Sequence, residues 1–328
     1  VIAAMLFGAI SGSAVAATSA IGGILGPFME KENYSKEFGA AINITASTTG
    51  LVIPPSNVLI VYSLASGGVS IASLFLAGYI PGILMGLALM LVAAIWIKKK
   101  GYPAGERSSM SVVLRTFFDA LPSLFLLVVV IGGIVTGVFT ATEASGIAVL
   151  YTLVLSFAYR ELKVSSLKSI FLSSVGTTAI VMLLIATSMS MSWVMSFENI
   201  PQNVSAALLA LSDNKFVILI IINVLLLFVG TFMDMTPAVL IFTPIFLPVV
   251  TSMGVDPVQF GIMMVMNLCV GLCTPPVGAV LFIGVGVAKT SIQKIMKPLL
   301  PLYAVMAIVL LLVTFIPAIS LWLPSLFE

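Results

Sequence analysis

Long apolar segments dominate this chain, and their length restricts the fold more than any other feature. Most are about as long as a helix that crosses a bilayer, which needs roughly 20 residues. Only 8% of the 328 residues are charged and the net charge is +2, which excludes a soluble domain and gives no basic surface for nucleic acid. The sequence therefore predicts an all-α integral membrane protein in contact with the lipid bilayer. Its nine apolar segments are 1–29, 39–64, 71–97, 120–141, 143–159, 170–197, 216–251, 258–286 and 299–324.

Two of these segments are interrupted midway by polar or helix-breaking residues. Segment 1–29 contains GAISGSAVAATS, and segment 216–251 contains GTFMDMTPAV. A backbone break at membrane depth is tolerated only where protein or a water-filled cavity surrounds it. We therefore expect two re-entrant helical hairpins with polar tips.

Two prolyl-proline pairs inside apolar segments reveal an internal repeat. GLVIPPSN at 50–57 matches GLCTPPVG at 271–278 with an offset of 221 residues, and the same offset carries the tip residue Ser13 onto Asp234. One ungapped offset across both hairpins and both proline-broken segments predicts a duplication, which is a signature of membrane transporters.

Lys and Arg gather in alternate loops and give the orientation of the repeat. Loops 98–115, 160–168 and 287–298 are basic, whereas loop 65–70 has no charge and loop 252–257 has only one Asp. Basic loops are expected in the cytoplasm. Counting spans between them makes the first hairpin enter from the cytoplasm and the second from outside, so the repeat is predicted to be inverted.

The repeat predicts three parts of the chain. Residues 1–97 form the first copy, residues 98–119 form a cytoplasmic loop with an amphipathic surface helix, and residues 120–328 form the second copy. Mapping the second copy back by the offset predicts roughly a hundred further residues before Val1. Within the copies we expect hairpin 1 at 1–29, a broken helix at 39–64, a scaffold helix at 71–97, hairpin 2 at 216–251, a broken helix at 258–286 and a final helix at 299–324.

The two tips and the two breaks are expected to meet near the middle of the bilayer. Helix N-termini there attract anions, and unwound carbonyl groups can bind a cation, which suits a small anion taken up with sodium as the coupling ion and no other cofactor. Hydroxyl, carboxylate and backbone oxygens are the ligands that a hard cation prefers. One candidate sodium site combines Ser11, Gly12 and Ser13 with Thr48, Thr49 and Gly50, and the other combines Gly230, Met233, Asp234 and Thr236 with Gly271, Cys273 and Thr274. Candidate substrate contacts are Ser13, Asn43, Pro54, Pro55, Ser56, Pro275 and Pro276.

Several of these residues have a structural interpretation beside the functional one. Asp234 is an intramembrane carboxylate and so a functional candidate. Its structural interpretation is a helix start, with Asp234 or Thr236 as the N-cap and Pro237 at the first helical position. Glu143 either caps a helix that begins at 144 or joins a gate. Cys269 and Cys273 fit small buried core residues.

The assembled motifs resemble one known family. GAISGSAVA, GLVIPPS, GVFTATEA, YRELK, GTFMDMTPAVLIFTPIFLPV and NLCVGLCTPPVGAVLF are similar to the large membrane subunit of tripartite ATP-independent periplasmic (TRAP) transporters. The resemblance covers essentially the whole chain, with Ala141 standing where many members have Pro. It implies an ion-transporter-like elevator fold in the bacterial inner membrane and a sodium-driven importer rather than an enzyme.

The resemblance also implies partners. They are a periplasmic substrate-binding protein, a small TRAP membrane subunit and an organic-anion substrate, either sialic acid or a C4-dicarboxylate. Residues 29–57 and 188–202 look most like the sialic-acid branch. The alternative function is an ion or anion channel-like subunit without sodium coupling, in which the polar tips form a filter.

Overall fold

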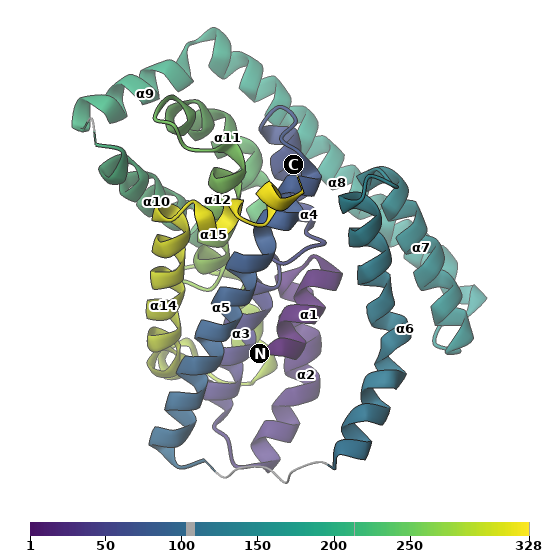
Figure 1. The fold of residues 1–328 in the computed structure, drawn as a ribbon. Coiled ribbons are helices and arrows are strands. Elements are labelled where there is room, and N and C mark those ends of the chain that lie inside the picture. The colour runs from purple at the N-terminus through teal and green to yellow at the C-terminus, as the bar shows by residue number, and fades with distance from the viewer. Residues whose placement is uncertain (103–108, 213, 328) are drawn as a thin grey trace. The chain divides into compact units, whose positions relative to one another are not determined.

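In the part of the chain that the structure describes, every regular element is a helix. The computed structural model describes residues 1–102, 109–212 and 214–327 (Figure 1). Within these ranges, seven helices are long and apolar enough to cross a membrane, as predicted for an all-α membrane protein. They are α5 (Ile71–Lys100), α6 (Met110–Val135), α7 (Ala141–Ala158), α8 (Val164–Phe197), α10 (Lys215–Phe232), α11 (Met235–Ser252) and α14 (Ile292–Phe315).

The helices form two compact units. The first contains residues 1–104 and 192–328, and the second contains residues 105–191. The first unit contains helices of both predicted copies, because both hairpins, both broken helices, α5 and α14 pack together. A compact unit is not a sequence repeat, so the division into two copies stays a prediction. The remaining helices are α1 (Ile2–Ser11), α2 (Ala14–Lys31), α3 (Lys36–Thr49), α4 (Asn57–Ala65), α9 (Ile200–Leu211), α12 (Pro257–Leu272), α13 (Ala279–Val287), α15 (Ala318–Leu321) and the 3-10 helix η1 (Pro324–Leu326).

The first copy of the repeat contains a tight hairpin and a broken helix. Helices α1 and α2 turn at Gly12, which ends α1 in the left-handed conformation at φ 63°. Helix α3 ends at Thr49, and α4 begins only at Asn57, after the residues that include Pro54 and Pro55. Proline cannot donate a backbone hydrogen bond within a helix, so the break falls where the prolines predict it.

The second copy repeats this pattern. Helices α10 and α11 turn at Met233 and Asp234, and α12 and α13 are separated by residues 273–278 around Pro275 and Pro276. Both prolyl-proline bonds are cis. Helices α10 and α11 have 18 residues each and qualify by length and composition as spans, so their length alone does not establish a re-entrant hairpin.

Three predicted boundaries are wrong. Residues 110–119, expected in a separate surface helix, are the first turns of α6, because Ser109 caps the helix there by accepting a hydrogen bond from Val112 N. Helix α6 then continues through Pro122 into the apolar part. The rest of that prediction, at 103–108, lies outside the described residues. Residues 198–215, left between the predicted apolar segments 170–197 and 216–251, contain α9. The final helix is α14, which begins at Ile292 and stops before Pro317 rather than covering 299–324.

Helices from the two copies pack against each other. Helix α5 packs on its counterpart α14 and α3 packs on its counterpart α12, whereas the other two contacts are crossed, with α2 on α13 and α11 on α4. Figure 1 shows α5 and α14 side by side and antiparallel, since α5 descends to Lys100 while α14 rises toward α15. The Cys269 Sγ donates to the Thr48 carbonyl oxygen at 3.1 Å, and these residues are 221 positions apart. In a two-fold arrangement, counterparts that contact each other lie close to the axis.

The second unit is held by few polar contacts. Tyr151 Oη donates to the Pro122 carbonyl at 2.6 Å and ties α7 to α6. Thr140 and Glu143 form a capping box, in which Thr140 N donates to Glu143 Oε2 at 2.8 Å and Glu143 N donates to Thr140 Oγ1 at 3.2 Å. This geometry confirms the capping interpretation of Glu143, although α7 begins at Ala141 rather than at 144.

Candidate transport site

The first hairpin contacts the break in α3 through backbone atoms. A Cβ at Gly50 would lie 2.5 Å from the Met5 carbonyl oxygen and 2.8 Å from the Gly8 Cα. A Cβ at Gly8 would lie 2.7 Å from the Ser47 carbonyl oxygen. Only glycine permits so close an approach. The lack of side chains at Gly8 and Gly50 therefore lets the backbone of the hairpin pack directly on the backbone of the break.

The second hairpin contacts the break in α12 in the same way. A Cβ at Gly271 would lie 2.6 Å from both the Cα and the carbonyl carbon of Gly230. On the other side of the break, Gly278 N donates to the Thr231 carbonyl oxygen at 2.9 Å and joins the start of α13 to the end of α10. The structure thus brings together Gly230 and Gly271, two of the residues predicted for the second sodium site.

The tip of the first hairpin lies beside the start of α4. A Cβ at Gly12 would lie 3.2 Å from the side chain of Asn57. Ser13 is the N-cap of α2, and its Oγ accepts from Ala16 N at 3.2 Å. Ser13 N donates to the exposed Ser11 Oγ at 3.4 Å. The tip residues therefore order the turn and leave part of the polar tip accessible.

Asp234 is an exposed carboxylate at the tip of the second hairpin. It occupies the N-cap position of α11, but its side chain makes no capping hydrogen bond. Pro237 is the third residue of the helix and not the first, because α11 begins at Met235. The neighbouring Met233 and Thr236 are half-buried. The side chain of Asp234 is thus not needed to satisfy the backbone of α11.

The hydroxyl groups at the end of α3 are buried and bonded within the protein. Thr49 Oγ1 donates to the Thr45 carbonyl at 2.8 Å, and Thr48 Oγ1 lies 3.0 Å from the same carbonyl oxygen and 3.2 Å from Cys273 Sγ. Each hydroxyl oxygen keeps acceptor capacity when it donates. In the second break, Thr274 Oγ1 donates to the Val270 carbonyl at 2.7 Å, and the Cys273 carbonyl accepts from Tyr303 Oη.

Both cysteines are buried free thiols, as the interpretation as core residues predicted. Their sulfur atoms also face α3, through Thr48 and through the Ile44 carbonyl at 3.9 Å from Cys273 Sγ. A thiol is a poor ligand for a hard cation. Any contribution of Cys273 to a sodium site would come from its carbonyl oxygen.

The candidate substrate residues have different surroundings. Asn43 is buried, and its Nδ2 donates to the Thr18 carbonyl at 2.7 Å, so the amide joins α3 to α2. Ser56 is buried and caps α4 by accepting from Leu59 N at 3.4 Å. Pro276 is exposed, whereas Pro54 is buried and Pro55 and Pro275 are half-buried. The proline residues of the second break are thus the more accessible of the two pairs.

Four helices begin at the tips and breaks. Helices α2 and α11 begin at the two tips, and α4 and α13 begin after the two breaks. The first N–H groups of a helix have no partner within it and carry partial positive charge, so each of these N-termini attracts an anion. Contacts of α2 with α13 and of α4 with α11 bring the helices of the two copies together in pairs.

A buried amide network was not predicted from the sequence. Asn267 Nδ2 donates to the Asn223 carbonyl at 2.8 Å and to Asn223 Oδ1 at 2.9 Å, and Asn223 Nδ2 reaches Thr314 Oγ1 at 3.3 Å. Gln259 Nε2 donates to the Thr314 carbonyl at 2.9 Å. The network joins α10, α12 and α14. The signal was three amide residues inside apolar segments, where polar side chains commonly bond across helices.

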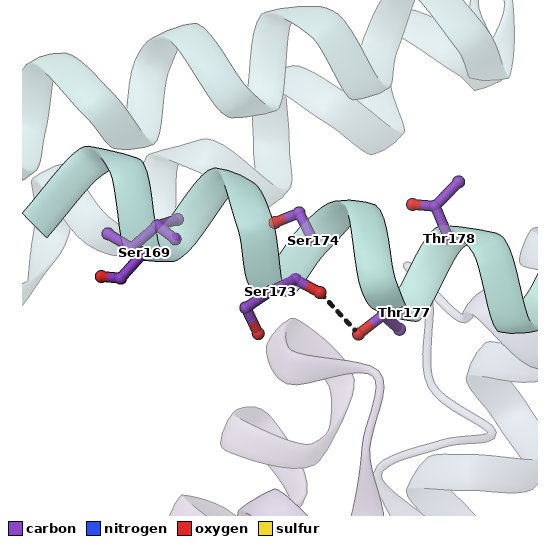
Figure 2. A pocket seen from close by; sticks show the side chains of 6 residues that line it. Ser169, Ser173, Ser174, Thr177 and Thr178 are labelled. Atoms are coloured by element: carbon purple, nitrogen blue, oxygen red, sulfur yellow. Dashed lines mark hydrogen bonds between the residues drawn. The ribbon is translucent and has the colours of Figure 1, made fainter.

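A row of hydroxyl groups on α8 was also missed. A hollow of about 670 Å³ lies along this helix, and Figure 2 shows Ser169, Ser173, Ser174, Thr177 and Thr178 along it. Thr177 Oγ1 donates to the Ser173 carbonyl at 3.1 Å. The signal in the sequence was the interval of four residues between Ser169, Ser173 and Thr177, which places them on one helix face. Small residues at this interval permit close helix packing.

Comparison with known proteins identifies the family. Residues 1–319 match the sequence model described as tripartite ATP-independent periplasmic transporter, DctM component. The chain belongs to this family. The "Uncharacterized protein YgiK" of Salmonella typhimurium is 56% identical over 327 residues, which cover 100% of this chain and 75% of that protein. The "Isethionate TRAP transporter permease protein DctMQ" of Oleidesulfovibrio alaskensis is 42% identical over 97% of this chain and 50% of its own length.

These findings confirm the family resemblance. The relatives with assigned functions are named as transporter permease subunits, so this DctM-family chain is a transport subunit and not an enzyme, and it is a multi-pass protein of the inner membrane. The "Sialic acid TRAP transporter large permease protein SiaM" of Vibrio cholerae is 36% identical over 100% of this chain and 77% of that protein. That identity is lower than the 42% shared with the isethionate permease, so it gives no preference for the sialic-acid branch.

Proposed function

We propose that this chain imports a small organic anion together with sodium, as the transport subunit of a TRAP system with an elevator-type movement. The observation that carries the proposal is the paired contact between hairpin and break. Gly50 against Gly8 in one copy and Gly271 against Gly230 in the other place each polar tip beside a broken helix. A channel needs no such pair, whereas a transporter with repeated halves uses two half-sites around one substrate.

Two further observations support an inverted repeat. Helices α5 and α14 are antiparallel counterparts (Figure 1). Thr48 contacts Cys269 at the offset of the repeat. An axis lying in the membrane plane relates one copy to the other with opposite orientation, which provides similar inward-facing and outward-facing states.

The first compact unit is the proposed moving body. It contains both hairpins, both broken helices and the packed pair α5 and α14. Residues 71–97, expected to be scaffold, therefore belong to this body in the proposal. In the second unit, the most apolar 18-residue stretch of α8 has no buried residue, and only 6% of the residues in the corresponding stretch of α7 are buried. Those helices therefore depend on lipid or on other subunits to cover their apolar side chains. We assign them to the fixed frame.

Sodium is proposed to bind at the two tips. The hydroxyl oxygens of Ser11, Ser13, Thr48 and Thr49, with backbone oxygens near Gly12 and Gly50, form the first ligand set. The second set combines the Asp234 carboxylate with Thr236, Thr274 and backbone oxygens of Gly230, Met233, Gly271 and Cys273. The exposed Asp234 carboxylate without a capping bond is the strongest support for a ligand role.

The proposed substrate is a carboxylate or sulfonate of low molecular mass. Relatives are named for isethionate and for sialic acid, both of which are organic anions. The N-termini of α2, α4, α11 and α13 supply positive partial charge for such a group. The proposed partners are a periplasmic binding protein and a small membrane subunit, which the tripartite family description and the name DctMQ support.

Uptake into proteoliposomes tests the sodium assignment. The variant Asp234→Asn keeps the size of the side chain but removes its charge. Even the loss of a residue that only hydrogen-bonds to a metal ligand costs about 10–100-fold in metal affinity, so the loss of a charged ligand should cost at least as much. We expect the sodium concentration that gives half-maximal uptake to rise at least tenfold in Asp234→Asn. Ser13 occupies the position that corresponds to Asp234 in the first copy, and Ser13→Ala should lower the Hill slope for sodium. Isethionate, succinate and sialic acid serve as labelled substrates, with the cognate binding protein present.

The matched control is Asp256→Asn. Asp256 also occupies an N-cap, where its Oδ1 accepts from Val258 N at 2.7 Å, and Asn can make the same cap. This variant should leave sodium dependence unchanged. Sodium-independent or non-saturable uptake by the unaltered protein would refute the symport proposal, and unchanged sodium dependence in Asp234→Asn would refute the site.

A further inference from the structure

A groove between α5 and α14 has an apolar half and a basic half. Its volume is about 610 Å³, within the range of small-molecule sites. Val92, Ile95, Trp96 and Pro301 line the apolar half, and the basic half consists of Lys99, Lys100 and Lys297. A second cavity of about 410 Å³ shares Trp96, Lys100 and Lys297 with it and extends toward Lys294. We call the two cavities together the α5–α14 groove.

The basic half lies at the end of both helices. Helix α5 has 30 residues, so it is about 45 Å long, which matches a bilayer including its headgroups. Its last three residues are lysines, and Lys294 and Lys297 lie in the first two turns of α14. The lysines therefore lie at headgroup level, on the side that the distribution of Lys and Arg assigns to the cytoplasm.

An apolar stripe leads along α5 into the basic half. Leu87, Leu91 and Ile95 are 55%, 61% and 60% exposed, and they follow one another at intervals of four residues. Lys99 is the next position of the same stripe. Residues four apart lie on one face of a helix, so a lipid chain that follows the stripe would end with its headgroup at Lys99.

The charges in the groove are largely uncompensated. Within the described residues, Lys36 forms the only ion pair, with Glu30 at 3.3 Å, so none of the groove lysines has a carboxylate partner. Among the described residues, Glu37 is the one acid that lines the second cavity, and its Oε1 accepts from Thr290 Oγ1 at 3.2 Å. Lys100 Nζ lies 6.0 Å from the centre of the Trp96 ring, which keeps it at the edge of the apolar half.

We propose that the α5–α14 groove binds an anionic phospholipid of the cytoplasmic leaflet. Its phosphate contacts Lys99, Lys100 and Lys297, and one acyl chain lies along Leu87, Leu91 and Ile95. A free phosphate would bind only in the basic half of the groove, and a zwitterionic lipid would balance only part of the positive charge of the lysines. An anionic phospholipid matches both the apolar and the basic half. The proposal does not depend on sodium coupling or on the transported substrate.

Native mass spectrometry of the full-length transporter tests the proposal. Phosphatidylglycerol and phosphatidylethanolamine are titrated in parallel, and retained lipid is counted. Each lysine at a membrane surface contributes about fivefold to binding of an anionic lipid. We expect Lys100→Gln with Lys297→Gln to weaken phosphatidylglycerol binding roughly 25-fold. Phosphatidylethanolamine binding should change less than twofold.

The control pair is Lys31→Gln with Lys289→Gln, which removes two charges from the same unit outside the groove and should leave lipid binding unchanged. If the groove pair does not assemble, Lys297→Gln alone should still cost about fivefold, and Lys297→Arg should restore binding. Equal lipid loss from both pairs, no preference for phosphatidylglycerol, or displacement of the lipid by millimolar inorganic phosphate would each overturn the proposal.

Discussion

The contact between Gly271 and Gly230 gives a prediction of opposite sign for two chemically identical substitutions. Both Gly271 and Gly286 lie in helices of the second copy. A Cβ at Gly271 would lie 2.6 Å from two backbone atoms of Gly230, which is 0.8 Å closer than ordinary contact at 3.4 Å. Gly286 is exposed, and its added Cβ would meet nothing within 4 Å.

The substitution Gly271→Ala should therefore destabilise the protein. Neither backbone can rotate away as a side chain can, so the hairpin has to shift, and overpacking of this kind costs about 1–3 kcal/mol. By the usual scaling of the unfolding entropy with chain length, this lowers Tm by roughly 1.5–4 °C. Gly286→Ala, in contrast, should gain up to about 1 kcal/mol, because Ala is the better helix former.

Thermal unfolding of the purified variants measures both effects, and uptake measures the functional one. A shift of the second hairpin by nearly 1 Å should lower sodium-dependent uptake on the order of tenfold or more. If Gly271→Ala unfolds at or above the Tm of the unaltered protein and transports normally, the backbone contact does not hold the hairpin, and the reasoning fails.

Two further substitutions probe the polar core and the first tip. Asn267→Leu leaves Asn223 Oδ1 without its donor and should cost about 1–3 kcal/mol in unfolding free energy, while Asn223→Leu combined with it should cost less than the sum of the two, as read from a double-mutant cycle. Gly12→Ala places a side chain at φ 63° and should cost about 1–2 kcal/mol, whereas Gly12→Asn should cost less because Asn tolerates this conformation. Equal Tm values for the two Gly12 variants would contradict the second expectation.

The sequence predicts the two tip turns and the two helix breaks well because their signals are local. Gly12 marks a turn that needs positive φ, and the prolyl-proline pairs interrupt two helices within a few residues. Helix ends marked only by charge are predicted poorly. Arg115 and Asp119 lie inside α6, and Lys294 and Lys297 lie inside α14, because a charged side chain at the membrane boundary does not end a helix. The start of α9 carries a usable signal in Pro201, near its first residue.

The partners of the candidate site required the structure. Glycine spacing gives no sign that Gly50 meets Gly8 or that Gly271 meets Gly230, because those contacts join segments about 40 residues apart in the chain. Asn223, Asn267 and Gln259 were visible as amides in apolar segments, but only the folded helices show that they bond to one another. The expected N-cap bond of Asp234 is absent, which sequence preference alone could not reveal.

The close glycine contacts have a consequence for how substrate preference can change. A contact made by backbone atoms alone does not constrain the identity of side chains that point away from it. Residues at the accessible tips, such as Ser11 and Asp234, can then be exchanged while the hairpins keep their places. The same packing of hairpins and broken helices can in this way present different substrate-binding residues. This offers a physical reason why proteins of similar sequence are named for anions as unlike as isethionate and sialic acid.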